Sequence, residues 1–401
     1  MLKRLLAGFA LLLPLAPLGA QTLDATDTVG AGAVMDRVVR DLCDKRVALL
    51  TEPSTHGFGN TLAFKAALVR RLVDECHYDA FMIESGVYDF LNIARRLDAQ
   101  ELVPDSMLTA AIGGVWANRE VSALVPFLLD RARRVRRGRL TLAGLDDQFG
   151  AGTWAQREMA EELVRDVSAP DRERCLAVLR THLLWQYTDS APFGGAEKAR
   201  IVGCLDAVSH VSPRDPARAV FDTWMVENFR RALAQELPES RPAGVDENTF
   251  TFDARDRAML LNFQWWLSRL PARSKVIVWT ATVHGAKDLA AVPGYAWLVP
   301  MGPSIQREFG SAAFVLAFSA ARGAYRFARQ PEHALPIAPD STMEGGVFRD
   351  GGADVRYVDA AQLRRLGVIA ARPLGADFKA ADWSRVVDGV VVFREERAPR
   401  R

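Results

Sequence analysis

The sequence predicts an α/β protein with a mostly parallel central sheet flanked by helices and a helical insertion in the middle of the chain. Short apolar runs alternate with amphipathic segments of helical length through most of the 401 residues. This alternation is typical of repeated β-α-β units, whose parallel sheet is covered on both faces. Residues 154–237 have helical spacing throughout, with breaks at prolines, which predicts three or four helices rather than strands.

The elements follow in a regular order along the chain. Each predicted strand is a short apolar run bounded by turn residues. The strands are expected at 47–50, 80–83, 140–145, 276–279 and 312–318, an antiparallel edge at 325–327 and a last strand at 386–393, with helices at 34–43, 61–76, 87–97 and 253–270. The charged residues 394–401 are expected to fray.

Composition places the chain among globular proteins with ample core. About half of the residues are apolar, and the formal net charge is only +2, which argues against nucleic-acid binding. No internal repeat divides the sequence. We therefore expect one domain over residues 21–401, with a helical cap at about 154–248, and the oligomeric state stays open.

The first twenty residues differ from the rest. Lys3 and Arg4 precede the apolar run Leu5–Leu15, and small residues lead to Ala20. This pattern predicts a signal peptide that is cleaved near Ala20, and thus a periplasmic or secreted protein. An uncleaved anchor is the alternative, and no later segment is long and apolar enough to cross a bilayer.

If the protein is exported, its four cysteines are expected to form disulfide bonds, because thiols pair in oxidising compartments. Cys43 and Cys76 each precede a predicted strand, at the same end of neighbouring parallel strands, whereas Cys175 and Cys204 lie on consecutive helices. Three pairings are possible. We favour Cys43–Cys76 and Cys175–Cys204.

Polar side chains follow four predicted strands. Glu52, Glu84, Asp146 and His284 stand at these strand ends, and His56 lies in the loop after the first strand. The carboxyl ends of parallel strands form the ligand crevice of such sheets, so these groups should meet there. Two carboxylates and an imidazole at adjacent strand ends suit proton transfer or metal binding.

The nucleophile and cofactor motifs that could be recognised are missing. The chain has no Gly-x-Ser-x-Gly elbow, phosphate loop, dinucleotide glycine fingerprint or His-Glu-x-x-His motif. The remaining candidate for the nucleophile is a water molecule that is activated by a histidine or by a divalent metal ion. No cofactor is required by the first alternative, and the same side chains could hold zinc in the second.

Seven blocks of the sequence resemble the erythromycin esterase family, whose members open macrolide lactones by water attack with a histidine as general base. They lie in the family's order over roughly residues 40–320 and read TEPSTHG, FMIESG, WANREV, LAGLDDQF, RDRAMLLN, VIVWTATVHGAKD and MGPSIQREFG. The resemblance implies an ester or lactone as substrate. It makes His56 the base and Glu52 its acidic partner, adds Glu84 and His284 to the catalytic group, and implies that Trp116, Arg119, Asp146 and Arg255 line or brace the substrate site.

The chain departs from the family pattern at four points. Glu52 and His56 are four residues apart instead of three, and Thr51 precedes the glutamate where glycine is usual. In the fourth-strand block Ala281 replaces the first of two histidines, and Thr282 replaces asparagine. We expect an exported hydrolase of this type. A metal-dependent hydrolase with the same residues, or a non-catalytic envelope protein that kept the fold, are the alternatives.

Overall fold

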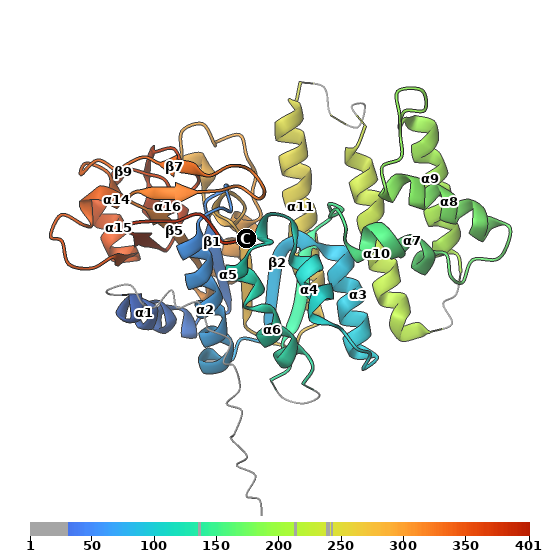
Figure 1. The fold of residues 1–401 in the computed structure, drawn as a ribbon, viewed down its shortest axis with the longest axis horizontal. Helices are drawn as coiled ribbons and strands as arrows, with labels where there is room; N and C mark the ends of the chain where they lie inside the picture. The colour runs from blue at the N-terminus through green and yellow to red at the C-terminus, as the bar shows by residue number, and fades with distance from the viewer. Residues whose placement is uncertain (1–30, 135–137, 212–214, 238–240, 242–243) are drawn as a thin grey trace, which may run out of the picture.

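The computed structural model describes residues 31–134, 138–211, 215–237, 241 and 244–401, and the predicted signal peptide lies outside them. A seven-stranded sheet with the order β3-β2-β4-β1-β5-β11-β8 forms the centre (Figure 1). All neighbouring strands pair in parallel except β8, which is antiparallel to β11. The predicted fold class is confirmed.

The predicted strands are found within three residues of their expected bounds, but the strands at 333–335, 355–359, 368–371 and 379–382 were not predicted. The sheet consists of β1 (Val47–Glu52), β2 (Ala80–Gly86), β3 (Thr141–Asp146), β4 (Val276–Ala281), β5 (Ala313–Ala320), β8 (Val355–Asp359) and β11 (Gly389–Phe393), and two small hairpins are formed by β6 (Gly323–Tyr325) with β7 (His333–Leu335) and by β9 (Val368–Ala371) with β10 (Lys379–Asp382). Every residue of β1, β4 and β5 is buried. Such apolar runs are typical of strands covered on both faces.

Helices cover both faces and one side of the sheet. Those before the insertion are α1 (Ala31–Cys43), α2 (Gly59–Cys76), α3 (Val87–Asp98), α4 (Asp105–Ile112), η1 (Gly114–Trp116), α5 (Arg119–Ser122) and α6 (Val125–Ala132). The middle of the chain forms α7 (Trp154–Leu163), α8 (Asp171–Leu183), α9 (Gly195–Ser209), α10 (Pro216–Gln235) and α11 (Glu247–Ser268). The remaining ones are α12 (Thr282–Gly285), η3 (Leu289–Ala291), α13 (Gly302–Phe309), η4 (Gly310–Ala312), α14 (Met343–Gly346), α15 (Ala360–Leu366) and α16 (Trp383–Val386).

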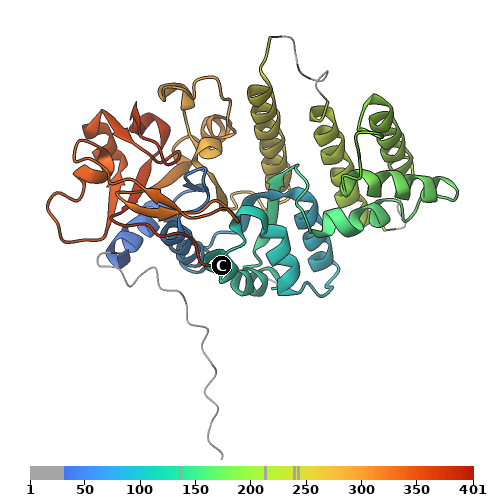
Figure 2. The same cartoon turned by 45° about the horizontal axis from the view of Figure 1, so that its top comes forward.

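The helical insertion, α7–α10, lies beside the β3 edge of the sheet, next to α3 and α11 (Figures 1 and 2). Helix α11 covers this edge with side-chain donors. Asn262 Nδ2 donates to the carbonyl of Leu145 at 2.7 Å, and Trp266 Nε1 donates to the carbonyl of Gly144 at 3.1 Å. These bonds satisfy carbonyls of an edge strand that would otherwise be open to pairing.

Strands β1 and β2 are not neighbours, contrary to the sequence prediction. Strand β4 lies between them and pairs with both. The prediction was wrong because a β-α-β pattern shows that two strands are parallel but not whether a later strand is inserted between them. The carboxylates at the ends of β1 and β2 are consequently separated by the end of β4.

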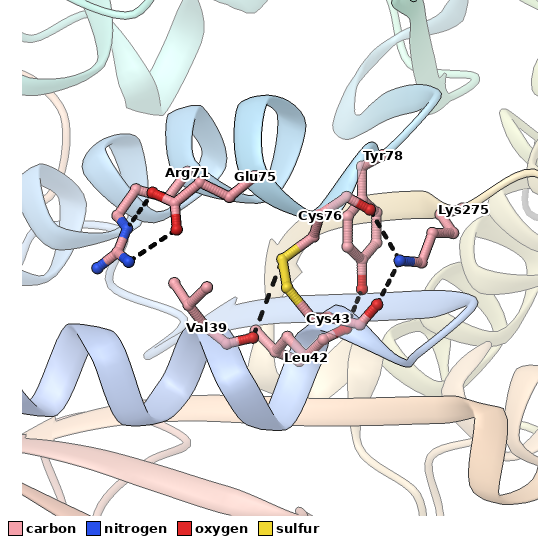
Figure 3. The surroundings of a disulfide bond; sticks show 8 residues. All are labelled: Val39, Leu42, Cys43, Arg71, Glu75, Cys76, Tyr78 and Lys275. Carbon is pink, nitrogen blue, oxygen red and sulfur yellow. Dashed lines mark hydrogen bonds and ion pairs between the residues drawn. A yellow bond between two sulfur atoms is a disulfide. The ribbon is translucent and has the colours of Figure 1, made fainter.

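Both predicted disulfides are confirmed. Cys43 at the end of α1 is bonded to Cys76 at the end of α2 (Figure 3), and Cys175 of α8 is bonded to Cys204 of α9. Beside the first bridge Lys275 Nζ donates to the carbonyl oxygens of both Cys43 and Cys76. Within the described part of the chain, no helix is long and apolar enough to span a membrane.

The C-terminal residues do not fray, which corrects the sequence prediction. The buried carboxylate of Glu396 accepts hydrogen bonds from the backbone N–H groups of Asn60 and Thr61, at 2.5 and 3.1 Å, in the first turn of α2. Arg397 and Arg400 both bind the buried Glu120, so the C-terminus lies beside α5 (Figure 1). The charges of this segment have partners in the fold, and these partners were not visible from local composition.

Candidate active site

His56 lies in a tight loop after β1. Its backbone N–H donates to the carbonyl of Pro53 at 2.9 Å, and its φ of 48° is in the left-handed region. Gly57 follows, where a Cβ would lie 2.2 Å from the carbonyl oxygen of Arg326. Non-glycine residues adopt positive φ at an energetic cost and do so preferentially at functional sites. The loop therefore fixes the imidazole close to the end of β1.

Glu52 holds this imidazole. Its Oε1 lies 3.0 Å from His56 Nδ1 and accepts a hydrogen bond from Trp116 Nε1 at 2.8 Å, while Oε2 is ion-paired with Lys65 Nζ. Glu52 and Lys65 are almost completely inaccessible to solvent, and the ammonium group also lies 4.0 Å from the centre of the Trp279 ring. Burial lowers the pKa of Lys65 well below its ordinary value, opposed in part by the charge of Glu84, but the adjacent carboxylate of Glu52 favours the charged form. A buried carboxylate in turn needs such partners to stay charged.

This arrangement makes His56 a proton acceptor. Burial, opposed in part by the charge of Glu84, lowers the pKa of His56 to about 4, so the ring is neutral at pH 7. With Glu52 as the acceptor at Nδ1, the proton is on Nδ1 and the lone pair is on Nε2. Across the described residues no side chain or backbone group forms a hydrogen bond with His56 Nε2.

A second centre forms around Arg255 of α11, at the ends of β2, β3 and β4. The guanidinium group donates to Glu84 Oε1 at 2.8 Å and to Asp146 Oδ2 at 2.6 and 3.0 Å. Glu84 Oε2 accepts from Thr280 Oγ1 and from the backbone N–H of Ala281 at 2.8 and 2.7 Å. Burial alone would raise the pKa of Glu84, but the charges of His284 and Arg255 hold it well below its ordinary value.

His284 is part of this second centre. Its Nδ1 lies 2.7 Å from Asp256 Oδ2, and its Nε2 lies 3.3 Å from Glu84 Oε1. Burial favours the neutral ring, but these two carboxylates prevail and raise the pKa of His284 to about 9. The ring is therefore an imidazolium that donates from both nitrogens.

The neighbouring cation, Arg255, has its Nη1 only 3.0 Å from His284 Nε2. If His284 were neutral this contact would be a hydrogen bond, whereas with an imidazolium it is a contact between like charges. The carboxylates of Glu84, Asp146 and Asp256 offset the two positive charges, so the imidazolium is the form that the surroundings favour.

The two centres lie within electrostatic reach of each other. The charges of Glu84, His284 and Arg255 all act on the pKa of His56. The strand order β3-β2-β4-β1 places the ends of these four strands side by side along one edge of the sheet. The structure thus brings together the imidazoles and carboxylates that the sequence assigned to one crevice, but divides them into a Glu52–His56 pair and an Arg255-centred cluster.

The other predicted site residues differ in their placement. Trp116 is buried and contacts the His56 ring edge-on, with 5.0 Å between centroids, as well as binding Glu52. Arg119 is exposed at the start of α5, and its backbone N–H donates to the carbonyl of Arg400. Within the described ranges the Arg119 side chain forms no hydrogen bond or ion pair with either centre, so its contact with a substrate stays a prediction.

Two residues of the site were not assigned a role from the sequence. Lys65 is a lone charge among buried residues of α2, and this mismatch with its apolar neighbours was the available signal. Asp256, directly after Arg255, orients His284 and accepts from the backbone N–H of Met301 at 2.9 Å. Its role depends on how α11, which packs against β3, is placed relative to His284 of α12, and no local pattern predicts that placement.

The charged groups of the second centre already have partners. Arg255 donates to Glu84 and Asp146, and its Nη1 lies 3.0 Å from His284 Nε2. Within the part of the chain that the structure describes, no group of three or more His, Cys, Asp or Glu side chains is arranged to hold a metal ion. Metal dependence stays untested by this arrangement.

Comparison with known proteins gives one family and several relatives. Residues 73–395 match the family model described as erythromycin esterase. This segment contains Glu84, Asp146, Arg255 and His284 and begins after His56. A proposed hydrolase of Bacillus subtilis (strain 168), YbfO, is 27% identical over 294 residues, which are 67% of this chain and 62% of that protein. The chain thus spans less than two thirds of the length of this curated relative.

Three solved structures share the fold. A succinoglycan biosynthesis protein has a TM-score of 0.68 at 12% identity, and covers 91% of this chain and 92% of its own. A Bacillus cereus protein has a TM-score of 0.66 at 14% identity, with the same coverage of both chains. An erythromycin esterase mutant, EreC in its open conformation, has a TM-score of 0.63 at 13% identity and covers 92% of this chain and 97% of its own.

Proposed function

Because the chain belongs to the erythromycin esterase family, we propose that it is a hydrolase that cleaves an ester or lactone with a water molecule activated by His56. One observation carries this proposal. His56 is neutral, is held at Nδ1 by a buried carboxylate and has its Nε2 lone pair unengaged by any described group. This is the state that a general base needs before it takes a proton from water.

The Glu52–His56 pair then supplies the base. As the water oxygen attacks the ester carbonyl, a water proton moves to Nε2 and the ring becomes an imidazolium. When the tetrahedral intermediate collapses, the bond between the carbonyl carbon and the alkoxide oxygen breaks, and the imidazolium returns the proton to that oxygen. Glu52 accepts the Nδ1–H bond throughout and stabilises the positive charge that develops. Lys65 and Trp116 keep the carboxylate of Glu52 in place, so the geometry of the base is prepared before the substrate binds.

The Arg255-centred cluster holds two cations, Arg255 and His284, whose charges act on His56. Attack on the carbonyl places a negative charge on its oxygen, and preorganised cationic donors stabilise such an oxyanion. His284 carries a fixed positive charge within electrostatic reach of His56. Both of its N–H groups are engaged by Asp256 and Glu84, so we assign to His284 a stabilisation of the oxyanion through its charge and not through a hydrogen bond.

Export is part of the proposal. The predicted signal peptide and the two disulfides together support a periplasmic or secreted protein. Expression of the full chain in a bacterial host, followed by fractionation and N-terminal sequencing, tests this. Mature protein that begins near Gln21 in the periplasm supports export, and full-length protein that stays in the cytoplasm contradicts it.

The catalytic assignment is tested with His56→Asn and a matched control, His333→Asn, at an exposed histidine. A panel of aryl esters and lactones is assayed for turnover. Loss of a positioned general base costs about 10²- to 10⁴-fold in kcat, so His56→Asn should lose this much while the control keeps wild-type turnover. Equal turnover in both variants would show that His56 is not the base.

The same preparations separate the alternatives. Elemental analysis, with turnover before and after chelation, identifies a metal-dependent hydrolase if activity follows the metal content. Alanine at position 281, where the family pattern has a histidine, favours a protein that binds without turning over. Ligand binding with no hydrolysis of any panel member would support that alternative.

A further inference from the structure

A cavity of about 380 Å³ lies directly beside the Arg255-centred cluster. No residue of that cluster lines the cavity, but two wall residues connect to it. Asp147 follows Asp146, which binds Arg255, and Thr251 precedes Phe252, whose ring stacks on His284 with 5.1 Å between centroids. A ligand of ordinary size can therefore have one end in the cavity and the other at the proposed hydrolytic site.

Among the described residues, the cavity wall carries two carboxylates and no lysine or arginine. These are Asp147, after β3, and Glu236, after α10. Arg231 and Arg255 act on the charge of Asp147 but do not line the cavity. His182 Nε2 lies 3.4 Å from Glu236 Oε1 and is the remaining titratable group of the wall. The wall thus offers negative charge to whatever enters.

Asp147 is incompletely partnered for a buried carboxylate. It is 1% exposed, and its side chain accepts one hydrogen bond, from Gln235 Nε2 to Oδ2 at 3.2 Å. No described residue donates to Oδ1. Burial, together with the neighbouring Asp146, raises the pKa of Asp147 to about 7. A buried carboxylate in this position gains from a cation that approaches through the cavity.

Aromatic rings form the apolar part of the wall. Phe149 and Trp185 both contact the ring of His182, with centroid distances of 6.2 and 5.7 Å. Trp185 is 55% exposed, although a large aromatic side chain is usually covered, and its backbone has a positive φ of 48°. Aromatic faces next to carboxylates attract organic cations, ammonium groups above all.

We propose that this cavity is a subsite for an organic cation, an ammonium group attached to an apolar or aromatic body. As a substrate subsite it rests on the proposed ester hydrolysis, because the cation would be the part of the substrate remote from the scissile bond. As a binding site it stands by itself. The carboxylates of Asp147 and Glu236 recognise the charge, and Phe149 and Trp185 cover the apolar body.

Direct binding provides the first test. Benzyltrimethylammonium is titrated calorimetrically into the wild type and into Asp147→Asn, Trp185→Ala and Trp185→Phe. Glu173→Gln, which removes an exposed acid of α8 outside the cavity, is the matched control. Loss of a carboxylate or of the indole should weaken binding about tenfold. The Trp185→Phe variant should regain part of the affinity through its smaller ring, whereas Glu173→Gln should keep the wild-type Kd.

Failure to bind the cation, or equal affinity in the wild type, Asp147→Asn and Trp185→Ala, would overturn the subsite. Because Trp185 is exposed, its variants decide the question even if Asp147→Asn does not fold. The second test compares kcat/KM for 4-(trimethylammoniomethyl)phenyl acetate and for 4-neopentylphenyl acetate, in which carbon replaces the charged nitrogen. The wild type should prefer the cation about tenfold, and Trp185→Ala should lose most of this preference.

The two proposals can fail separately. Binding of the cation without hydrolysis of either ester would keep the subsite and contradict the esterase function. Hydrolysis of both esters at equal rates, without calorimetric binding of the cation, would keep the esterase function and contradict the subsite.

Discussion

Replacing Lys65 by methionine tests the structural support of the proposed base. The ammonium group is fully buried and ion-paired with Glu52 Oε2, while Glu52 Oε1 faces His56 Nδ1. Methionine fills a similar volume without a charge, so Glu52 is left buried with one neutral donor, Trp116, and the imidazole. Removing one partner of a buried ion pair typically costs about 3–5 kcal/mol.

A double variant separates the cost of breaking the ion pair between Lys65 and Glu52 from the cost of lost packing. Lys65→Met should lower the free energy of unfolding by roughly 3 kcal/mol or more, measured by urea unfolding, whereas Lys65→Met with Glu52→Gln removes both charges and should recover much of it. Lys65→Arg keeps the charge and serves as the conservative control. A double variant that is less stable than Lys65→Met would contradict this reasoning.

Activity gives the second readout of the same variants. Without the positive charge of Lys65, Glu52 gains a proton more readily, and a neutral carboxyl group stabilises the imidazolium of His56 less well than a carboxylate does. Hydrolysis by Lys65→Met should therefore fall in kcat, with the pH profile displaced to higher pH, and the double variant should stay inactive although it is stable. Wild-type kcat and an unchanged pH profile in Lys65→Met would refute the role of Lys65.

Four further outcomes are expected. Because burial holds the pKa of His56 near 4, kcat/KM for a neutral ester should stay level from pH 7 to about 5 and fall below that; a midpoint near 6.5 would contradict the assignment. The pKa of His284 is raised to about 9, so its contribution to stability is complete below about pH 6.5 and is lost as the pH rises through 9. The free energies of unfolding of the wild type and His284→Asn, measured in urea, should therefore differ most at pH 6. A difference that does not depend on pH would argue against an imidazolium. Replacing both Cys175 and Cys204 by serine opens a loop with a separation of 29 residues and should lower the free energy of unfolding by about 3–4 kcal/mol. Urea unfolding under oxidising conditions measures this loss, and equal stability of the wild type and the variant would show that the bridge does not form. Glu120→Gln removes the buried partner of Arg397 and Arg400, and limited proteolysis should then cut the C-terminal segment faster than in the wild type; equal rates would show that other contacts hold it.

The elements of the sheet were predictable because each strand is a short run of apolar residues with polar residues at its end. Glu52, Glu84 and Asp146 are the last or nearly last residues of three such strands, so their meeting at one edge followed from parallel pairing alone. The order of the strands did not follow. The insertion of β4 between β1 and β2 depends on contacts between residues some 200 positions apart, which a local pattern does not record.

The partners of the site residues were also hidden in the sequence. Lys65, Asp256 and the C-terminal Glu396 are charged residues in segments that read as helix or as frayed tail, and each one is buried against a partner from a distant element. Burial makes the pairing of a charge obligatory, but the sequence does not show which charges are buried. Fraying was predicted for residues 394–401 for this reason.

By itself the sequence determined the fold class, the strand ends that carry the acids and imidazoles, and the family, because these depend on local periodicity, spacing and short motifs. It favoured one of the three possible disulfide pairings, and the structure decided between them. The tertiary structure decided that the polar groups form two centres, with a pKa of about 4 for His56 beside Glu52 and of about 9 for His284 beside Glu84 and Asp256. The physical reason is that a protonation state is set by desolvation and by the charges within a few ångströms, and both exist only after distant segments have packed together.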